Sequence, residues 1–101
     1  MKDKKMILKE RVTEQGLFVS LCDVEIMGMT FKKGDVSLTV TESFYLGEEA
    51  DEETIKESLR NANIANITGD KSIRLAIEMG MISEENVLEI GEVLHAQFVR
   101  L

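Results

Sequence analysis

The side chain best suited to chemistry in this sequence is His95, the one histidine among 101 residues. An imidazole titrates near neutral pH, so it can bind a ligand or move a proton. On a strand that begins at Val93, His95 and Gln97 would project from the same face, toward solvent, because side chains alternate along a strand. These two residues form the centre of a candidate ligand-binding site, to which Tyr45 and Asn66 would contribute if the fold brings them close. The alternative is a structural histidine whose ring is hydrogen-bonded within the protein.

Cys22, the one cysteine, and its neighbour Asp23 are the second place where chemistry could occur. Asp23 is placed to cap a single helical turn that ends at Gly28. The start of that turn could lower the pKa of the thiol, but the carboxylate beside it opposes thiolate formation. We therefore expect Cys22 to be a small buried hydrophobe rather than a nucleophile. One histidine and one cysteine are also too few for a metal site built from His and Cys, so we expect no metal and no cofactor. A carboxylate site for Mg²⁺ or Ca²⁺ stays open, although residues 48–53 lack the spacing of a calcium loop.

The composition is that of a globular domain, with 44% hydrophobic and 31% charged residues. The longest stretch without a charge, residues 61–69, is far shorter than the roughly 20 apolar residues of a membrane helix. The first residues include no apolar run suited to a signal peptide, and one cysteine cannot form an internal disulfide. We expect a single domain over residues 1–101 that is cytoplasmic and makes no membrane contact.

The formal net charge of −7 argues against general nucleic-acid binding, which depends on Lys and Arg to neutralise phosphates. Acidic residues crowd between Glu48 and Glu53, where the start of a helix would favour them. The basic residues are uneven, however, because five of the twelve Lys and Arg lie in the first eleven residues. RNA binding is therefore kept as the weakest alternative, and it would use Lys2, Lys4, Lys5, Lys9, Arg11, Lys32 and Lys33.

The first half of the chain alternates in the manner of β-strands. Residues 6–12 and 17–22 are expected to form a hairpin, and the second of these strands is apolar on both faces, as an interior strand would be. Residues 36–41 form the clearest strand, with three apolar side chains facing a core.

The second half begins with helical periodicity. One helix is expected from Asp51, with a buried stripe at i, i+4 and i+7, and a second over residues 70–79. Ile64 and Ile67, between the helices, are expected to lie in a short buried connection. Residues 83–101 fit either a helix or a hairpin with a turn at Gly91, and the β-branched content favours the hairpin. The order of elements predicts an α+β, two-layer sandwich: a small antiparallel or mixed sheet with two helices packed on one face.

Read together, several short segments resemble a small archaeal family, domain of unknown function 424. The resemblance covers nearly the whole chain and rests on Cys22-Asp23, Gly28, Thr30-Phe31, Gly34-Asp35, Ser43-Phe44-Tyr45, Ala65-Asn66-Ile67, Gly69 and His95-Ala96-Gln97. The sequence departs from the family pattern at Leu46, where members often have glycine, and at Leu94, where they often have proline. The resemblance implies an α+β two-layer domain in an archaeal cytoplasm, with a loose association with translation genes and no assigned activity.

The leading functional prediction is a non-catalytic binding or accessory module that acts through protein contacts, in keeping with the scarcity of reactive groups. The rival is an enzyme or small-molecule binder centred on His95 and Gln97, and its ligand site would draw on Tyr45, Asn66, Cys22 and Asp23. The sequence does not decide whether the protein is an enzyme, although it favours the non-catalytic role. The expected partner is a protein of unknown identity, and homo-oligomer formation stays open.

Overall fold

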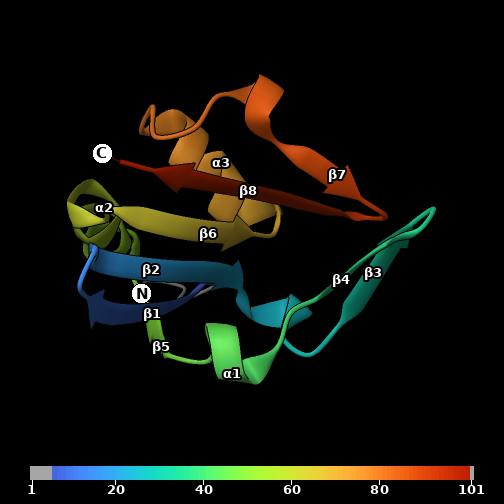
Figure 1. Cartoon of the computed structure of the whole chain (residues 1–101), viewed down its shortest axis with the longest axis horizontal. Coiled ribbons are helices and arrows are strands. Elements are labelled where there is room, and N and C mark those ends of the chain that lie inside the picture. The colour runs from blue at the N-terminus through green and yellow to red at the C-terminus, as the bar shows by residue number, and fades with distance from the viewer. Residues whose placement is uncertain (1–5, 101) are drawn as a thin grey trace.

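The polypeptide is built around a mixed sheet with strand order β5-β1-β2-β6-β8-β7, seen in Figure 1. The computed structural model describes residues 6–100. In this range the sheet strands are β1 (Met6–Thr13), β2 (Gly16–Asp23), β5 (Glu48–Ala50), β6 (Ile64–Thr68), β7 (Leu88–Ile90) and β8 (Val93–Val99). A separate hairpin consists of β3 (Thr30–Lys33) and β4 (Val36–Thr39). The helices are α1 (Glu42–Tyr45), α2 (Glu52–Asn61) and α3 (Asp70–Glu78), and the 3-10 turns are η1 (Val24–Ile26) and η2 (Glu84–Asn86).

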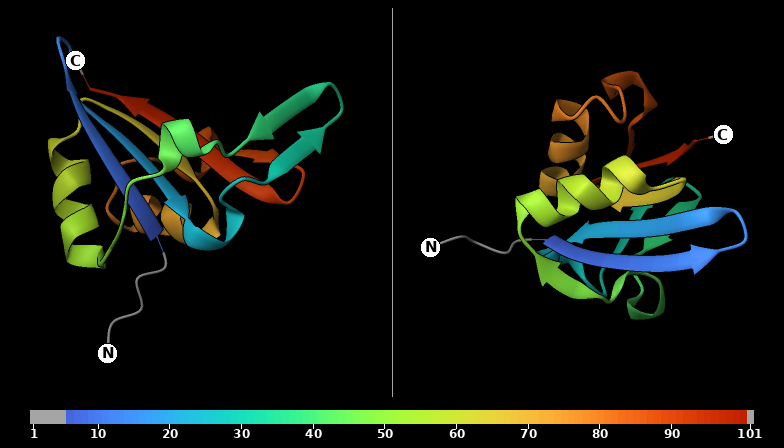
Figure 2. Two further views of the ribbon diagram at one scale, coloured as in Figure 1. Left: turned by 90° about the horizontal axis from the view of Figure 1, so that it is seen from below. Right: turned by 90° about the vertical axis from the view of Figure 1, so that its left-hand side faces the viewer.

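Helices α2 and α3 cover one face of the sheet, so the predicted α+β layers are confirmed (Figure 2). Asp51 caps α2 by accepting a hydrogen bond from the backbone N–H of Thr54 at 3.0 Å. The helices bury their apolar stripes against the inward side chains of β2 and β6, as periodicity predicts. The main core contains Val19, Leu21, Ile55, Leu59, Ile67 and Ile73, each at most 1% exposed.

The prediction that Ile64 and Ile67 lie in a short connection is wrong, because both residues belong to the interior strand β6. It runs parallel to β2 and antiparallel to β8. Five residues are too few for their hydrophobic period to distinguish a strand from a buried loop. The segment is a strand because its backbone pairs with β2 on one side and with β8 on the other.

The C-terminal hairpin is confirmed. β7 pairs with β8 antiparallel, and Gly91 in the turn has φ 63°, a conformation that glycine adopts without strain. His95 and Gln97 share a face of β8 as expected, but the expectation that His95 faces solvent is wrong. It is only 8% exposed, because other elements cover this part of the sheet.

A smaller hydrophobic core lies on the face of the sheet that carries His95. Tyr45 of α1 packs there with Ile7, Cys22 and Val40, which follows β4. The β3–β4 hairpin extends beyond the sheet beside β7 (Figures 1 and 2), so Val36 is more than half exposed rather than facing a core as expected. No helix within residues 6–100 is long and apolar enough to cross a membrane.

The acidic segment is divided between two elements rather than lying wholly at a helix start. Glu48 and Glu49 form the edge strand β5, which pairs with the first residues of β1. Glu52 and Glu53 occupy the first turn of α2, where the helix dipole favours negative charge.

Candidate functional site

Strand alternation defines the surface that carries most of the candidate residues, which we call the α1 face. It consists of the side chains of β1, β2, β6, β7 and β8 that point away from α2 and α3. These residues are Ile7, Lys9, Arg11, Thr13, Phe18, Ser20, Cys22, Ile64, Asn66, Thr68, Leu88, Ile90, Val93, His95, Gln97 and Val99. Helix α1 lies against part of this face (Figure 2).

A chain of polar contacts crosses the α1 face. The hydroxyl of Tyr45 lies 2.8 Å from Thr68 Oγ1, and that oxygen lies 2.8 Å from Nδ1 of His95. Nε2 of His95 lies 3.5 Å from the side-chain nitrogen of Gln97. The structure therefore brings three predicted residues together through Thr68, which the sequence analysis did not single out.

Register explains why these side chains meet. Thr68 stands opposite His95 in the β6–β8 pair, and Asn66 stands opposite Gln97. Directly opposed side chains in an antiparallel pair lie close enough to interact. A connection around Ile64 and Ile67, as the sequence predicts, gives Thr68 no partner on a neighbouring strand, so this contact follows from the strand pairing alone.

His95 is held as a neutral imidazole in this setting. Burial lowers its pKa, because removing the ring from water penalises the charged form. Burial also raises the pKa of Tyr45, with the Thr68 hydrogen bond acting in the opposite direction. A neutral ring between a hydroxyl and an amide can orient a ligand through hydrogen bonds.

Cys22 shares the α1 face but is inert in this environment. It is fully buried, and burial together with the charge of Asp23 raises its pKa to about 12. The thiolate is the nucleophilic form, so the geometry gives no support to covalent chemistry at this residue.

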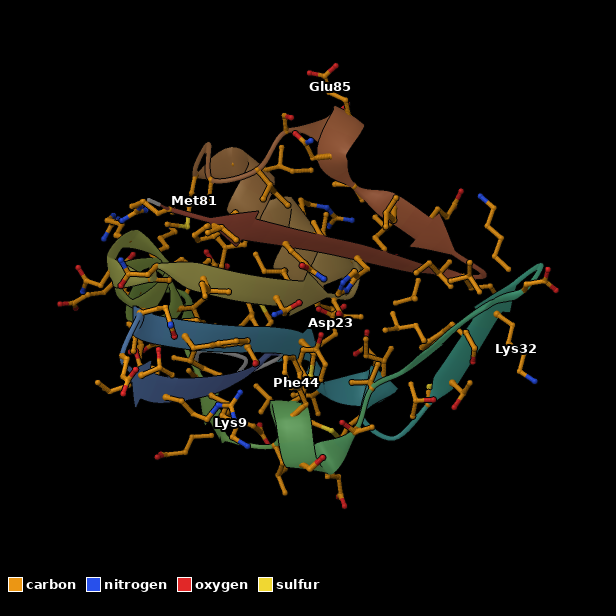
Figure 3. All side chains as sticks on the ribbon, viewed as in Figure 1. Lys9, Asp23, Lys32, Phe44, Met81 and Glu85 are labelled. Atoms are coloured by element: carbon orange, nitrogen blue, oxygen red, sulfur yellow. The ribbon has the colours of Figure 1, made fainter. Side chains whose placement is uncertain are left out.

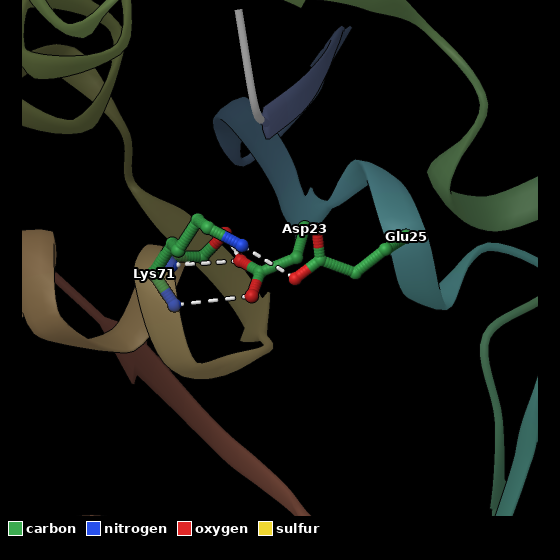
Figure 4. Close-up of polar contacts among 4 residues, drawn as sticks. Asp23, Glu25 and Lys71 are labelled. Atoms are coloured by element: carbon green, nitrogen blue, oxygen red, sulfur yellow. Dashed lines mark hydrogen bonds and ion pairs between the residues drawn. The ribbon is translucent and has the colours of Figure 1, made fainter. Parts of the chain in front are cut away.

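Asp23 belongs to the opposite side of the sheet and has a structural role (Figure 4). Its carboxylate accepts hydrogen bonds from the backbone N–H groups of Lys71 and Ser72 at 3.0 and 2.9 Å, and from the Ser72 hydroxyl at 2.8 Å. These groups begin α3, so Asp23 caps a helix remote in sequence, whereas its own turn η1 receives no side-chain cap from it. Beside it, Lys71 also pairs with Glu25.

The four described basic residues considered for RNA binding are divided between two elements, with Lys9 and Arg11 on β1 and Lys32 and Lys33 on β3. Lys9 donates a hydrogen bond to the main-chain oxygen of Ser43 at 2.6 Å, and Lys32 lies far from it on the β3–β4 hairpin (Figure 3). The Arg11 guanidinium lies 5.0 Å from the ring centre of Phe18. Lys2, Lys4 and Lys5 lie outside the described residues. Among residues 6–100, no group of three or more His, Cys, Asp or Glu side chains is placed to hold a metal ion.

The fold and the site together define a class: a two-layer α+β domain with a chain of polar contacts on the side of a mixed sheet opposite α2 and α3. Residues 10–101 match the model of the family described as "Protein of unknown function (DUF424)", so the chain belongs to this family.

A solved structure shares this architecture. The crystal structure of an uncharacterized conserved protein from Methanopyrus kandleri superimposes with a TM-score of 0.78 at 21% sequence identity, covering 95% of this chain and 93% of that protein. At this identity the likeness supports the fold alone. No curated protein sequence matches the chain.

Proposed function

We propose that this protein is a non-catalytic binding module that contacts a protein partner through the α1 face. The observation that carries the proposal is the mixture of apolar, amide and basic side chains that this face leaves accessible, with no acidic one from the five described strands. Its buried members belong to the core, and the accessible ones are Lys9, Arg11, Thr13, Phe18, Ile64, Asn66, Leu88, Gln97 and Val99. Glu49 of the edge strand β5 adds a carboxylate at the rim, opposite Ile7.

Such a surface has the composition of the centre of a protein–protein interface. Interface cores are depleted in Lys, Glu and Asp and enriched in aromatic residues and Arg. The α1 face offers half-buried Phe18 with Arg11 over its ring, and Phe44 of α1 packs edge-on against the same ring. Leu88 and Val99 add apolar side chains that are 60% and 62% exposed.

The same residues favour binding over catalysis. His95 is nearly buried and has its Nδ1 engaged, and the Cys22 thiol stays protonated at neutral pH. Neither group is poised to attack a substrate. The proposal also places the protein in the cytoplasm, where a lone thiol stays reduced.

The test compares two exposed valines on opposite sides of the sheet. Val99→Glu places a charge on the α1 face, whereas Val12→Glu makes the same change at an 88% exposed residue that does not belong to that face. A partner captured from native cell extract should be lost from the Val99→Glu protein and retained by the Val12→Glu protein. Hydrogen exchange in the purified complex should show protection on β8.

Equal capture by the two variants, or protection confined to α2 and α3, would overturn the proposal. Binding of single-stranded RNA that weakens steeply with salt would replace the protein partner by a nucleic acid.

A further inference from the structure

The polar chain on the α1 face has a preferred direction. The hydroxyl of Tyr45, a residue only 3% exposed, has Thr68 Oγ1 as its hydrogen-bond partner in the described part of the chain. If the Tyr45 hydroxyl donates to Thr68 Oγ1, the Thr68 hydroxyl can donate to Nδ1 of His95, and both hydroxyl hydrogens then have an acceptor. In the reverse direction the Tyr45 hydrogen would have no acceptor among residues 6–100. A buried donor without an acceptor is costly, so the direction from Tyr45 to His95 is favoured.

This direction fixes the tautomer of His95. Its neutral ring carries one hydrogen, and a ring that accepts at Nδ1 must carry that hydrogen on Nε2. Nε2 is the nitrogen that faces Gln97, whose side chain is exposed.

The outermost polar atoms at this point are therefore hydrogen-bond donors. The Gln97 amide can turn its oxygen to the Nε2–H of His95, which directs its own N–H groups outward. With its nitrogen beside Nε2 instead, both residues present donors. Both orientations leave this part of the surface in need of an acceptor.

We propose that His95 and Gln97 form an acceptor-binding subsite, at which a polypeptide partner places a carbonyl or carboxylate oxygen. The inference rests on the proposed function for the nature of the partner. Charge supports it, because the charged side chains that the described strands β1, β2, β6, β7 and β8 direct to the α1 face are Lys9 and Arg11, which are both basic and favour a neutral or acidic segment. Tyr45 and Thr68 act as positioning residues, since they set which ring nitrogen carries the hydrogen.

The first test reads the tautomer directly in the isolated protein. Nitrogen-15 spectra of the His95 ring, recorded above the ordinary pKa of histidine, should show Nε2 as the protonated nitrogen. Thr68→Val is nearly isosteric and removes the hydroxyl, so the two tautomers should become mixed while the fold persists. A wild-type ring protonated at Nδ1, or an unchanged ring in a folded Thr68→Val protein, would overturn the assignment.

The second test uses acetate as an acceptor probe and methylammonium as a donor probe. At equal concentrations, acetate should shift the ring signals of His95 and the side-chain amide signals of Gln97 more than methylammonium does. Gln97→Glu should reverse this order in the His95 signals, and Val12→Glu should leave it unchanged. A larger response to methylammonium in the wild-type protein would overturn the subsite.

Neither test uses the partner, so the two proposals can fail separately. A correct tautomer and an acetate preference, combined with equal partner capture by the Val99→Glu and Val12→Glu proteins, would leave the subsite in place and remove the protein-binding role. The opposite combination would leave the binding face in place and remove the subsite.

Discussion

Replacing Asp23 with alanine should destabilise the protein strongly, because this carboxylate ties the end of β2 to the start of α3. It is only 2% exposed, and it accepts three hydrogen bonds from Lys71 and Ser72. Assigning roughly 1 kcal/mol to each lost bond gives a decrease of about 3 kcal/mol in the free energy of unfolding. Part of this loss is that of an ordinary helix N-cap, about 1 kcal/mol.

Urea unfolding followed by far-ultraviolet circular dichroism measures this loss. With a slope of about 1.5 kcal/mol per molar urea, the midpoint should fall by about 2 M. The urea midpoint of the Asp23→Asn protein should lie between those of the wild-type and Asp23→Ala proteins. The amide oxygen of Asn can still accept hydrogen bonds, whereas its NH₂ group faces a backbone donor. Gly69 approaches this side chain so closely that an added Cβ would lie 2.4 Å from the carboxyl carbon, leaving little room for a replacement to move.

Glu25→Ala is the matched control, since Glu25 pairs with the same Lys71 but is exposed to solvent. Its midpoint should stay close to that of the wild-type protein, because exposed ion pairs contribute little. If Asp23→Ala unfolded at the same urea concentration as Glu25→Ala, the buried carboxylate would not be the anchor of α3, and this reasoning would be refuted.

Three further outcomes are expected. Burial lowers the pKa of His95, so the unfolded chain takes up the proton first as the pH falls below about 6.5, and the folded state loses stability there. In urea unfolding measured at several pH values, the His95→Gln protein should lose less stability than the wild-type protein as the pH falls. A difference in the free energy of unfolding between the two proteins that does not change with pH would contradict this expectation. A thiol reagent should modify Cys22 only in denaturant, because the residue is fully buried and its pKa is raised to about 12; rapid labelling of the native protein would show otherwise. Gly47→Ala would place a Cβ 2.1 Å from the main-chain oxygen of Leu8, so the melting temperature should fall by about 10 °C, corresponding to about 2 kcal/mol. An unchanged melting temperature would mean that the backbone moves aside at little cost.

Local patterns in the sequence were enough to predict much of the architecture. The period of two identified the first hairpin and placed His95 and Gln97 on one face of β8, and the helical period identified α2 and α3 with their buried stripes. These predictions succeeded because the spacing of apolar residues directly records which side of an element faces a core. The same reasoning failed for β6, whose five residues are too short to show a period.

Tertiary structure alone decided which faces meet. Tyr45, Thr68 and His95 come from three separate segments. Their contacts exist because β6 pairs with β8, and because α1 packs on β1 and β2 with Tyr45 reaching Thr68. Asp23 likewise caps α3 across 48 positions of sequence, although its neighbours predicted a local cap. A sequence pattern specifies the direction of a side chain relative to its own backbone, whereas contact depends on strand order and register, which are set by the packing of the whole chain.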